Sequence, residues 1–293
     1  MIRLAVRVRR EQAELVLAEL LVLAPAGVEE VQAGGESVEY AVYGAPGELP
    51  GLPALHAVVG DALVEISTTE IPDDWHERWK AFHCPVLIPA PAGRGPAIHV
   101  RPPWEQPSVA TDGPVEEIVI DPGQAFGTGG HASTRLCLEL LLELAAAEPA
   151  AGQLIDVGTG SGVLAIAAAR LGYAPVLALD HEQESVEAAA ENARVNDVHI
   201  DVRRFDLRTD RLPTMDLRAR RPPVVLANLL RPLLLELAAT MPRPPAHLIA
   251  GGLLIEEADE IARAFAVRLG LRERSRRASG EWAALWMDGG RSS

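Results

Sequence analysis

Residues 153–170 constrain the fold more than any other stretch of the chain. An apolar run, QLIDV, leads into Gly158, Gly160 and Gly162, and an alanine-rich helical pattern, AIAAARLG, follows. Glycines at this spacing let the backbone turn tightly and approach a ligand where a Cβ atom would collide. A strand, a glycine-rich turn and a helix in this order predict an α/β unit with a binding site at the turn.

The second half of the chain repeats this alternation of strands and helices. Apolar strands, most of them followed by helical patterns, are expected at residues 117–120, 153–157, 175–179, 223–227 and 246–250. Such alternation predicts a doubly wound, Rossmann-like α/β domain with a mainly parallel sheet. Ligands bind such a sheet at the carboxyl ends of its strands. We expect this domain to span residues 85–293.

The first 68 residues follow a different pattern. Strands are expected at residues 2–8, 28–33, 37–43 and 63–67, and helical patterns at 12–23 and, more weakly, 52–59. The order β-α-β-β-α-β predicts a small ferredoxin-like α+β domain over residues 1–68. Trp75 and Trp79 are four residues apart, on one face of a linker helix expected at residues 69–84.

The charge and the cysteine content exclude several classes of protein. The chain has 27 basic and 41 acidic side chains, so its formal charge is −14. A general nucleic-acid binder needs a basic surface, and direct nucleic-acid specificity is therefore not expected. Two cysteines are too few for a disulfide framework. No uncharged run approaches the ~18 apolar residues of a membrane span. We therefore expect a cytoplasmic protein that does not enter a membrane.

Asp180 points to a nucleoside-containing cofactor. It ends the apolar strand VLALD, 22 residues after Gly158, where a carboxylate can accept both hydroxyls of a ribose. The dinucleotide fingerprint G-x-G-x-x-G needs a third glycine, but Val163 occupies that position, and the loop has no phosphate-binding lysine. A sulfonium nucleoside has no pyrophosphate, and the pattern resembles that of S-adenosylmethionine-dependent methyltransferases. A nicotinamide cofactor and a purely structural turn remain the alternatives.

Two further segments carry candidate catalytic residues. Residues 121–134, DPGQAFGTGGHAST, place many glycines around one phenylalanine, which predicts a mobile flap before a helix that starts near Ala132. His131 in this segment is a candidate base, with local hydrogen bonding as the alternative. Asn228 ends the strand VVLAN, where its carbonyl could accept a hydrogen bond from a substrate amine and orient the nitrogen. A plain turn residue is the alternative there.

Together these segments resemble one family. DPGQAFGTGGH, IDVGTGSGVLAIAAARLG, ANLL and the closing Gly280-Glu281-Trp282 are similar to PrmA, the bacterial methyltransferases of ribosomal protein eleven of the large subunit. The resemblance runs from about residue 70 to residue 287. Cofactor contacts are implied for Thr134, Gly158, Asp180 and Asn228. Gly160 is added from the shape of the loop, and Asp206 is a weaker candidate for the adenine.

The family usually has threonine where this chain has Gly130, and Pro-Thr where it has Ala132-Ser133. The flap is therefore expected to be looser than in the family.

The resemblance also implies the reaction and the partner. S-adenosylmethionine would be the cofactor, no metal is expected, and lysine side chains and an α-amine of one ribosomal protein would each be methylated repeatedly. The first domain would grip this basic protein, and the enzyme is expected to be a monomer. A methyltransferase of the same fold for another protein, RNA or a small molecule remains the main alternative. A nicotinamide-dependent oxidoreductase lacks the third glycine, and a non-enzymatic binding module would leave the flap and Asp180 without a purpose.

Overall fold

The structure is a computed structural model of the whole chain. It describes residues 2–13, 16, 20, 29–31, 37–44, 63–70, 83–91, 94–107, 113–122, 129–148, 152–213 and 222–289. The chain forms two compact units, Met1–Phe82 and His83–Ser293, each with its own sheet and core. The linker helix predicted at residues 69–84 falls largely outside the described residues, and the predicted boundaries stay predictions.

The first unit contains an antiparallel sheet in the order β2-β3-β1-β4. Its elements are β1 (Ile2–Arg9), the short helix η1 (Arg10–Gln12), β2 (Glu29–Val31), β3 (Ser37–Gly44) and β4 (Leu63–Glu70). Side chains alternate between the two faces of the sheet. Val6 and Val8 are buried beside Tyr40, whereas Arg7 pairs with Glu39 at 2.9 Å. This alternation gives the unit a core on one face of its sheet.

The strands expected at residues 2–8, 37–43 and 63–67 are confirmed, and the one expected at 28–33 is confirmed over its described residues, Glu29–Val31. The helix predicted at residues 52–59 lies outside the described residues, and most of the helix predicted at 12–23 does too. The ferredoxin-like fold of this unit therefore stays a prediction.

The second unit begins with a separate three-stranded sheet. Its strands are β5 (Val86–Ile88), β6 (Ala97–Arg101) and β7 (Val115–Val119), in the order β5-β6-β7, with β6 and β7 parallel. The strand expected at residues 117–120 lies in this small sheet, so its assignment to the main parallel sheet was wrong. Within β7 Ile118 is buried and its neighbours are half-buried. This partial burial is typical of an edge strand, whereas a central parallel strand is buried on both faces.

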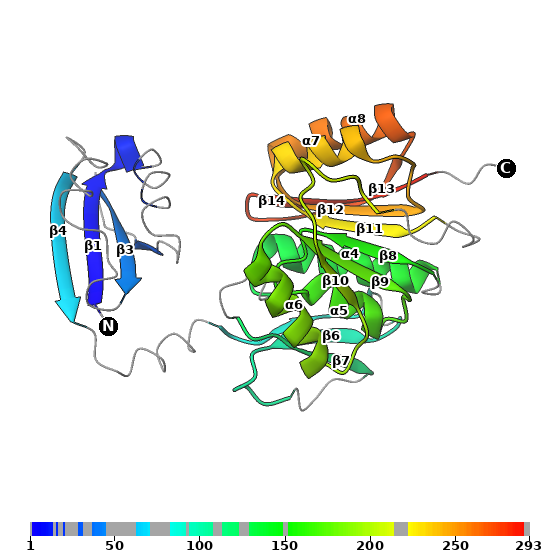
Figure 1. The fold of residues 1–293 in the computed structure, drawn as a ribbon, viewed down its shortest axis with the longest axis horizontal. Coiled ribbons are helices and arrows are strands. Elements are labelled where there is room, and N and C mark those ends of the chain that lie inside the picture. Colours follow the sequence, from blue (N-terminus) through cyan, green and yellow to red (C-terminus); the bar gives the residue numbers. More distant parts are fainter. Residues whose placement is uncertain are drawn as a thin grey trace. The chain divides into compact units, whose positions relative to one another are not determined.

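The main sheet has seven strands in the order β10-β9-β8-β11-β12-β14-β13 (Figure 1). They are β8 (Leu154–Val157), β9 (Val176–Asp180), β10 (Asp201–Arg204), β11 (Val224–Asn228), β12 (His247–Leu254), β13 (Arg272–Ser279) and β14 (Trp282–Asp288). The strands from β10 to β12 are parallel, and β14 and β13 close one edge as an antiparallel hairpin. The predictions for β8, β9, β11 and β12 are confirmed, and so is the doubly wound α/β class.

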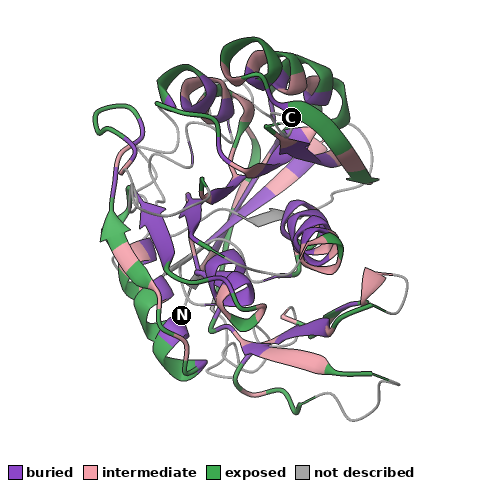
Figure 2. Ribbon diagram, turned by 90° about the vertical axis from the view of Figure 1, so that its right-hand side faces the viewer, coloured by how far each residue is buried: buried purple, intermediate pink, exposed green. Residues whose placement is uncertain are grey.

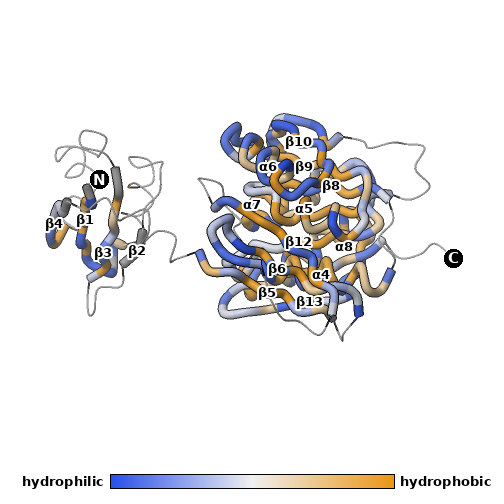
Figure 3. The backbone as a smooth tube through the Cα atoms, turned by 90° about the horizontal axis from the view of Figure 1, so that it is seen from below, coloured by the Kyte–Doolittle hydropathy of each residue, from blue (hydrophilic) through white to orange (hydrophobic). Residues whose placement is uncertain are grey.

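Helices cover both faces of the main sheet. They are α4 (Ala132–Ala147), α5 (Val163–Arg170), α6 (Gln183–Val195), α7 (Arg231–Thr240) and α8 (Ala258–Leu269), with the short helix η4 (Ile255–Glu257) before α8. Figure 1 shows α7 and α8 together on one side of the sheet. Along β9, Val176 and Ala178 belong to one core cluster, and Leu177 and Leu179 belong to the other. The apolar residues 176–179 thus fit a strand that helices cover on both faces, and Figures 2 and 3 show the central strands buried and hydrophobic.

The chain reverses its direction across the sheet next to β8. From β8 it proceeds through β9 to β10 at one edge, whereas β11 and β12 lie on the other side of β8. The carboxyl ends of β8 and β11 therefore border the crevice where open α/β sheets bind ligands. Within the described ranges, no helix combines the length and the apolar composition that crossing a membrane requires.

Candidate functional site

The turn after β8, residues 158–162, is called the glycine loop below. Gly158, Gly160 and Gly162 have φ values of +74°, +53° and +85°, in the left-handed region that glycine adopts without strain. The N–H of Gly158 donates to a carbonyl of β9 at 2.8 Å, and Gly162 is the N-cap of α5. The loop therefore has its shape because three of its five positions have no side chain.

The carboxylate of Asp180 is held against this loop. Asp180 ends β9 and is 7% exposed. Its Oδ2 accepts the N–H of Gly160 at 2.8 Å, and its Oδ1 accepts the N–H of Glu182 at 3.1 Å. The imidazole Nδ1 of His181 lies 3.4 Å from the same Oδ1. Each oxygen keeps a further lone pair for a ligand hydroxyl, because a carboxylate has about four acceptor positions.

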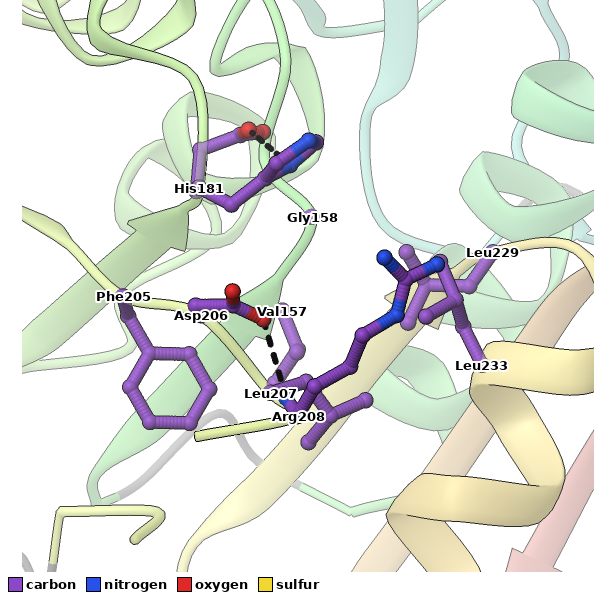
Figure 4. A pocket seen from close by; sticks show the side chains of 10 residues that line it. Val157, Gly158, His181, Phe205, Asp206, Leu207, Arg208, Leu229 and Leu233 are labelled. Carbon is purple, nitrogen blue, oxygen red and sulfur yellow. Dashed lines mark hydrogen bonds and ion pairs between the residues drawn. The ribbon is translucent and has the colours of Figure 1, made fainter. Parts of the chain in front are cut away.

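An open pocket of about 430 Å³ lies beside Asp180 (Figure 4). Gly158 and Asp180 line it from the loop side, Asp206 and Arg208 line it from the segment after β10, and Leu229 lines it from the segment after β11. Figure 4 shows the Arg208 side chain extending toward Leu229. The Oδ1 of Asp206 accepts the backbone N–H of Arg208 at 2.9 Å. Three of the residues predicted to bind a cofactor, Gly158, Asp180 and Asp206, thus meet at one pocket.

Asn228 and Thr134 form a second group next to this pocket. The Nδ2 of Asn228, at the end of β11, donates to the Oγ1 of Thr134 in α4 at 3.3 Å. The Oδ1 of Asn228 is buried and has no hydrogen-bond partner among the described residues. Leu229 follows Asn228 in the chain and lines the pocket. Its side chain packs so closely on Gly158 that a Cβ atom on Gly158 would overlap it. Asn228, Thr134 and Gly160 are not among the residues that line the pocket itself.

His131 is the N-cap residue of α4. The N–H of Ser133 donates to its Nδ1 at 3.3 Å, and the Ser133 hydroxyl lies 2.8 Å from the same nitrogen. Its ring packs edge-on against Trp282, with 4.7 Å between the centroids. Burial lowers the pKa of His131, which favours neutral imidazole. With Nδ1 accepting, the proton of the neutral ring is on Nε2. The lone pair of Nδ1, with which a base would accept a proton, is therefore already occupied by the hydrogen bond of the helix cap.

Asp156, in β8, is a buried carboxylate hydrogen-bonded to the glycine loop that the sequence reasoning missed. It is fully buried, and its Oδ2 accepts the hydroxyl of Thr159 at 2.7 Å. Its Oδ1 has no hydrogen-bond partner among the described residues. Burial raises the pKa of Asp156 to about 7, and the charge of Asp180 adds to this rise. The sequence contained this signal, because a carboxylate inside an apolar strand costs free energy unless it is hydrogen-bonded, paired or protonated.

A pH-dependent stability follows from this raised pKa. An aspartate in the unfolded chain titrates near ~3.9, so between about pH 4 and pH 7 the folded chain binds the extra proton and its free energy of unfolding falls as the pH rises. Asparagine does not titrate. The Asp156→Asn variant should therefore gain stability relative to the original chain by at most roughly 1.4 kcal/mol per pH unit across this window. Urea unfolding curves at pH 4, 5.5, 7 and 8 measure the difference, and parallel pH profiles would contradict the raised pKa.

Gly252 fixes the backbone beside Asn228. It has a φ of +75°, and a Cβ atom there would lie 2.6 Å from the carbonyl oxygen of Leu229. Gly270, the matched control, has a φ of +69° and open space around its Cβ position. Gly270→Ala should cost about 1–2 kcal/mol of unfolding free energy, the cost of the left-handed conformation. Gly252→Ala should cost roughly 1–3 kcal/mol more, because backbone must move. Equal losses in denaturant unfolding would show that the contact with Leu229 is not as tight as described.

The arrangement contains a glycine loop and a neighbouring carboxylate at an open pocket, and the strand beside the loop ends in an amide with an unused acceptor. Among the described residues, no group of three or more histidine, cysteine, aspartate or glutamate side chains could hold a metal ion. A parallel sheet with a terminal antiparallel hairpin, a glycine loop after its first strand and an acidic residue ending the next define the class of α/β methyltransferases.

Comparisons with known proteins give the family. The model of the family described as "Ribosomal protein L11 methyltransferase (PrmA)" matches residues 55–289. A ribosomal protein L11 methyltransferase of Pelobacter propionicus is 38% identical over 228 residues, which are 75% of this chain and 68% of that protein. The corresponding protein of Syntrophotalea carbinolica is 38% identical over 229 residues, covering 76% and 70%. The crystal structure of a ribosomal protein L11 methylase from Lactobacillus delbrueckii subsp. bulgaricus has a TM-score of 0.55 and 30% identity, covering 69% of this chain and 97% of that one. The chain belongs to the PrmA family of ribosomal protein L11 methyltransferases.

Proposed function

We propose that this methyltransferase transfers methyl groups from S-adenosylmethionine to amino groups of ribosomal protein L11. The observation that carries the proposal is the buried Oδ1 of Asn228, which has no hydrogen-bond partner among the described residues. Asn228 ends β11, and the next residue, Leu229, lines the pocket beside the glycine loop. An unpaired buried acceptor costs about 1–3 kcal/mol, so a ligand that donates a hydrogen to it is favoured. An amine is such a donor, and the family description names a ribosomal protein as the substrate that would carry the amine.

The residues at the pocket fit S-adenosylmethionine. The missing Cβ atom of Gly158 lets Leu229, which lines the pocket, pack directly against the loop, and the Asp180 carboxylate retains acceptor capacity for two ribose hydroxyls. The carboxylate of Asp206 lines the same pocket and can accept from the exocyclic amine of adenine. We assign cofactor contacts to Thr134, Gly158, Gly160, Asp180 and Asn228. When bound, S-adenosylmethionine supplies a methyl group on a positively charged sulfur, which a neutral amine nitrogen displaces in line.

The acceptor nitrogen must lose a proton before it can attack. A lysine amine with a pKa of ~10.4 costs about 4–5 kcal/mol to deprotonate at neutral pH, and an α-amine near ~8 costs about 1 kcal/mol. We assign Asn228 the catalytic role of accepting one amine hydrogen, which holds the nitrogen lone pair toward the methyl group. Because this orientation does not remove the proton, we infer that water takes it before the attack.

His131 is the second catalytic candidate, and its contacts favour a positioning role over that of a base. Its Nδ1 already accepts the N–H of Ser133 as the cap of α4, and Trp282 packs against its ring. Replacing His131 by glutamine is therefore expected to lower activity without moving the pH dependence of the rate. A shift of the pH–rate profile in this variant would instead assign the proton transfer to His131.

The charge of the first unit supports a basic protein partner. Residues 1–66, the larger part of this unit, carry four arginines and ten acidic residues, a net charge of 4 − 10 = −6. A surface of this sign attracts a basic protein and steers its approach. We propose that this unit grips the ribosomal protein, and that lysine side chains and the α-amine of the same substrate are methylated. We further propose a cytoplasmic monomer that neither enters membranes nor reads nucleic acid directly.

Mass spectrometry of purified ribosomal protein L11 tests the reaction. Incubation with the enzyme and S-adenosylmethionine should increase the intact mass of L11 in steps of one methyl group, located by peptide sequencing on amines. L11 whose amines have been blocked chemically beforehand is the control and should gain no mass. Unchanged mass of unblocked L11, in an enzyme preparation shown to bind S-adenosylhomocysteine, would contradict the proposed substrate.

A further inference from the structure

Two buried asparagines lie one turn apart at the end of α6. Asn192 is 2% exposed, and Asn196, the C-cap residue of the helix, is 3% exposed. Buried amides are stable when their donors and acceptors are all used, and the partners of such groups reveal what they hold in place.

Asn192 reaches two segments that are far apart in the sequence. Its Nδ2 donates to the carbonyl of Ser161, in the glycine loop, at 2.9 Å. Its Oδ1 accepts the N–H of Asp121, two residues after β7, at 3.1 Å. A single buried side chain thus bridges the glycine loop and Asp121, the residue at which the segment 121–131 begins.

The helix also contacts the loop directly. Ala189 lies one turn before Asn192, and a Cβ atom on Gly162 would be 3.1 Å from the Cβ of Ala189. The backbone of the glycine loop is therefore packed against α6 at Gly162 and hydrogen-bonded to it at Ser161.

Asn196 also forms hydrogen bonds through both its Oδ1 and its Nδ2, but to different segments of the chain. Its Oδ1 accepts the N–H of Val119 at 2.8 Å, and its Nδ2 donates to the carbonyls of Val119 and Asn192 at 2.7 Å each. It therefore anchors β7 to α6 and makes no described hydrogen bond to the glycine loop. The two asparagines match in residue type and burial, and of the two only Asn192 has a described hydrogen bond to the glycine loop.

We propose that Asn192 is a positioning residue for the cofactor site. By fixing the Ser161 carbonyl it restricts the glycine loop, whose three left-handed glycines would otherwise be free to adopt other conformations. By accepting the N–H of Asp121 it also ties the loop to the residues that follow β7. Such preorganisation lowers the conformational entropy lost on binding, so it acts on cofactor affinity. The inference rests on the proposed function, because the ligand of the loop is taken to be S-adenosylmethionine.

The matched variants Asn192→Asp and Asn196→Asp test this role. Each exchanges one NH2 group for an oxygen, and in Asn192→Asp that oxygen faces the Ser161 carbonyl, so two acceptors meet. We expect Asn192→Asp to raise the KM for S-adenosylmethionine and the Kd for S-adenosylhomocysteine about tenfold, with kcat at saturation nearly unchanged. Asn196→Asp should lose at least as much stability, because it loses two donated bonds, yet keep its KM. Equal KM changes in both variants, or an unchanged KM in Asn192→Asp, would overturn the role.

Hydrogen exchange on the unaltered chain gives a test that does not depend on the variants folding. Adding S-adenosylhomocysteine should slow exchange of the Asp121 amide, which donates to Asn192, and leave the Val119 amide, which donates to Asn196, at its original rate. Equal responses of the two amides would overturn the proposal. Failure of the unaltered chain to bind S-adenosylhomocysteine would overturn the proposed function and this inference with it. Binding with no selective response would overturn the inference alone.

Discussion

Replacing Asp180 by asparagine is expected to weaken S-adenosylhomocysteine binding roughly 100-fold or more. Hydrogen bonds to a charged group contribute about 1.5–3 kcal/mol each, and the substitution removes the charge from two expected bonds to the ribose. Both carboxylate oxygens also accept a backbone N–H, from Gly160 and Glu182. The NH2 group of asparagine would face one of these donors, so the glycine loop must shift as well.

Isothermal titration of the two proteins with S-adenosylhomocysteine measures this effect. Asp201→Asn is the matched control, because Asp201 begins the neighbouring strand β10, pairs with Arg203 and does not line the pocket. It should bind with an unchanged Kd. An Asp180→Asn variant that binds within threefold of the original chain would remove Asp180 from the cofactor site.

Replacing Asn228 by alanine is expected to lower kcat roughly 100-fold even when S-adenosylmethionine is saturating. The Asn228 carbonyl is the acceptor to which we assign the amine, and misplacement of a reacting group by about 1 Å costs a factor of this size. Saturation separates this loss from any weaker cofactor binding, because kcat then reports the loaded enzyme. Initial rates of methyl transfer to L11 over a range of cofactor concentrations give both quantities.

Thr134→Val is the companion variant for this prediction. It keeps the shape of the fully buried Thr134 and removes the oxygen to which the Nδ2 of Asn228 donates. The amide would lose an orienting bond but keep its carbonyl, so an intermediate fall in kcat is expected. If Asn228→Ala lost stability but retained kcat, Asn228 would be a structural turn residue and the amine would be held by other groups.

The elements that the sequence predicts well are those in which local pattern and tertiary burial agree. The strands β8, β9, β11 and β12 are mainly apolar, because helices cover both of their faces. Asp156 within β8 and the terminal Asp180 and Asn228 are exceptions. The glycine loop and Asp180 were predicted for the same reason, since a turn between a buried strand and a helix leaves few choices of residue. Figure 4 shows Gly158 and Asp206 lining the pocket with their neighbours, as their positions after strands suggested.

The elements that were missed depend on contacts between distant segments. The edge strand β13 has the sequence RERSRRAS, which lacks the alternation of apolar and polar residues typical of a half-buried strand. Its charged side chains form ion pairs with distant residues, such as Arg277 with Glu143. The strand β7 lies in a small separate sheet whose pairing no local pattern specifies. Asn192 reads as an ordinary polar helix residue, since its partners Ser161 and Asp121 are 31 and 71 residues away.

The distribution of label over a whole ribosomal subunit tests the central claim most directly. Large subunits from a strain lacking the enzyme are incubated with it and with S-adenosylmethionine labelled in the methyl group, and proteins and RNA are then separated. Protein methylation by this family predicts label in ribosomal protein L11, on its amines, and none in the ribosomal RNA. Label in the RNA, or unlabelled L11 beside another labelled protein, would contradict the account.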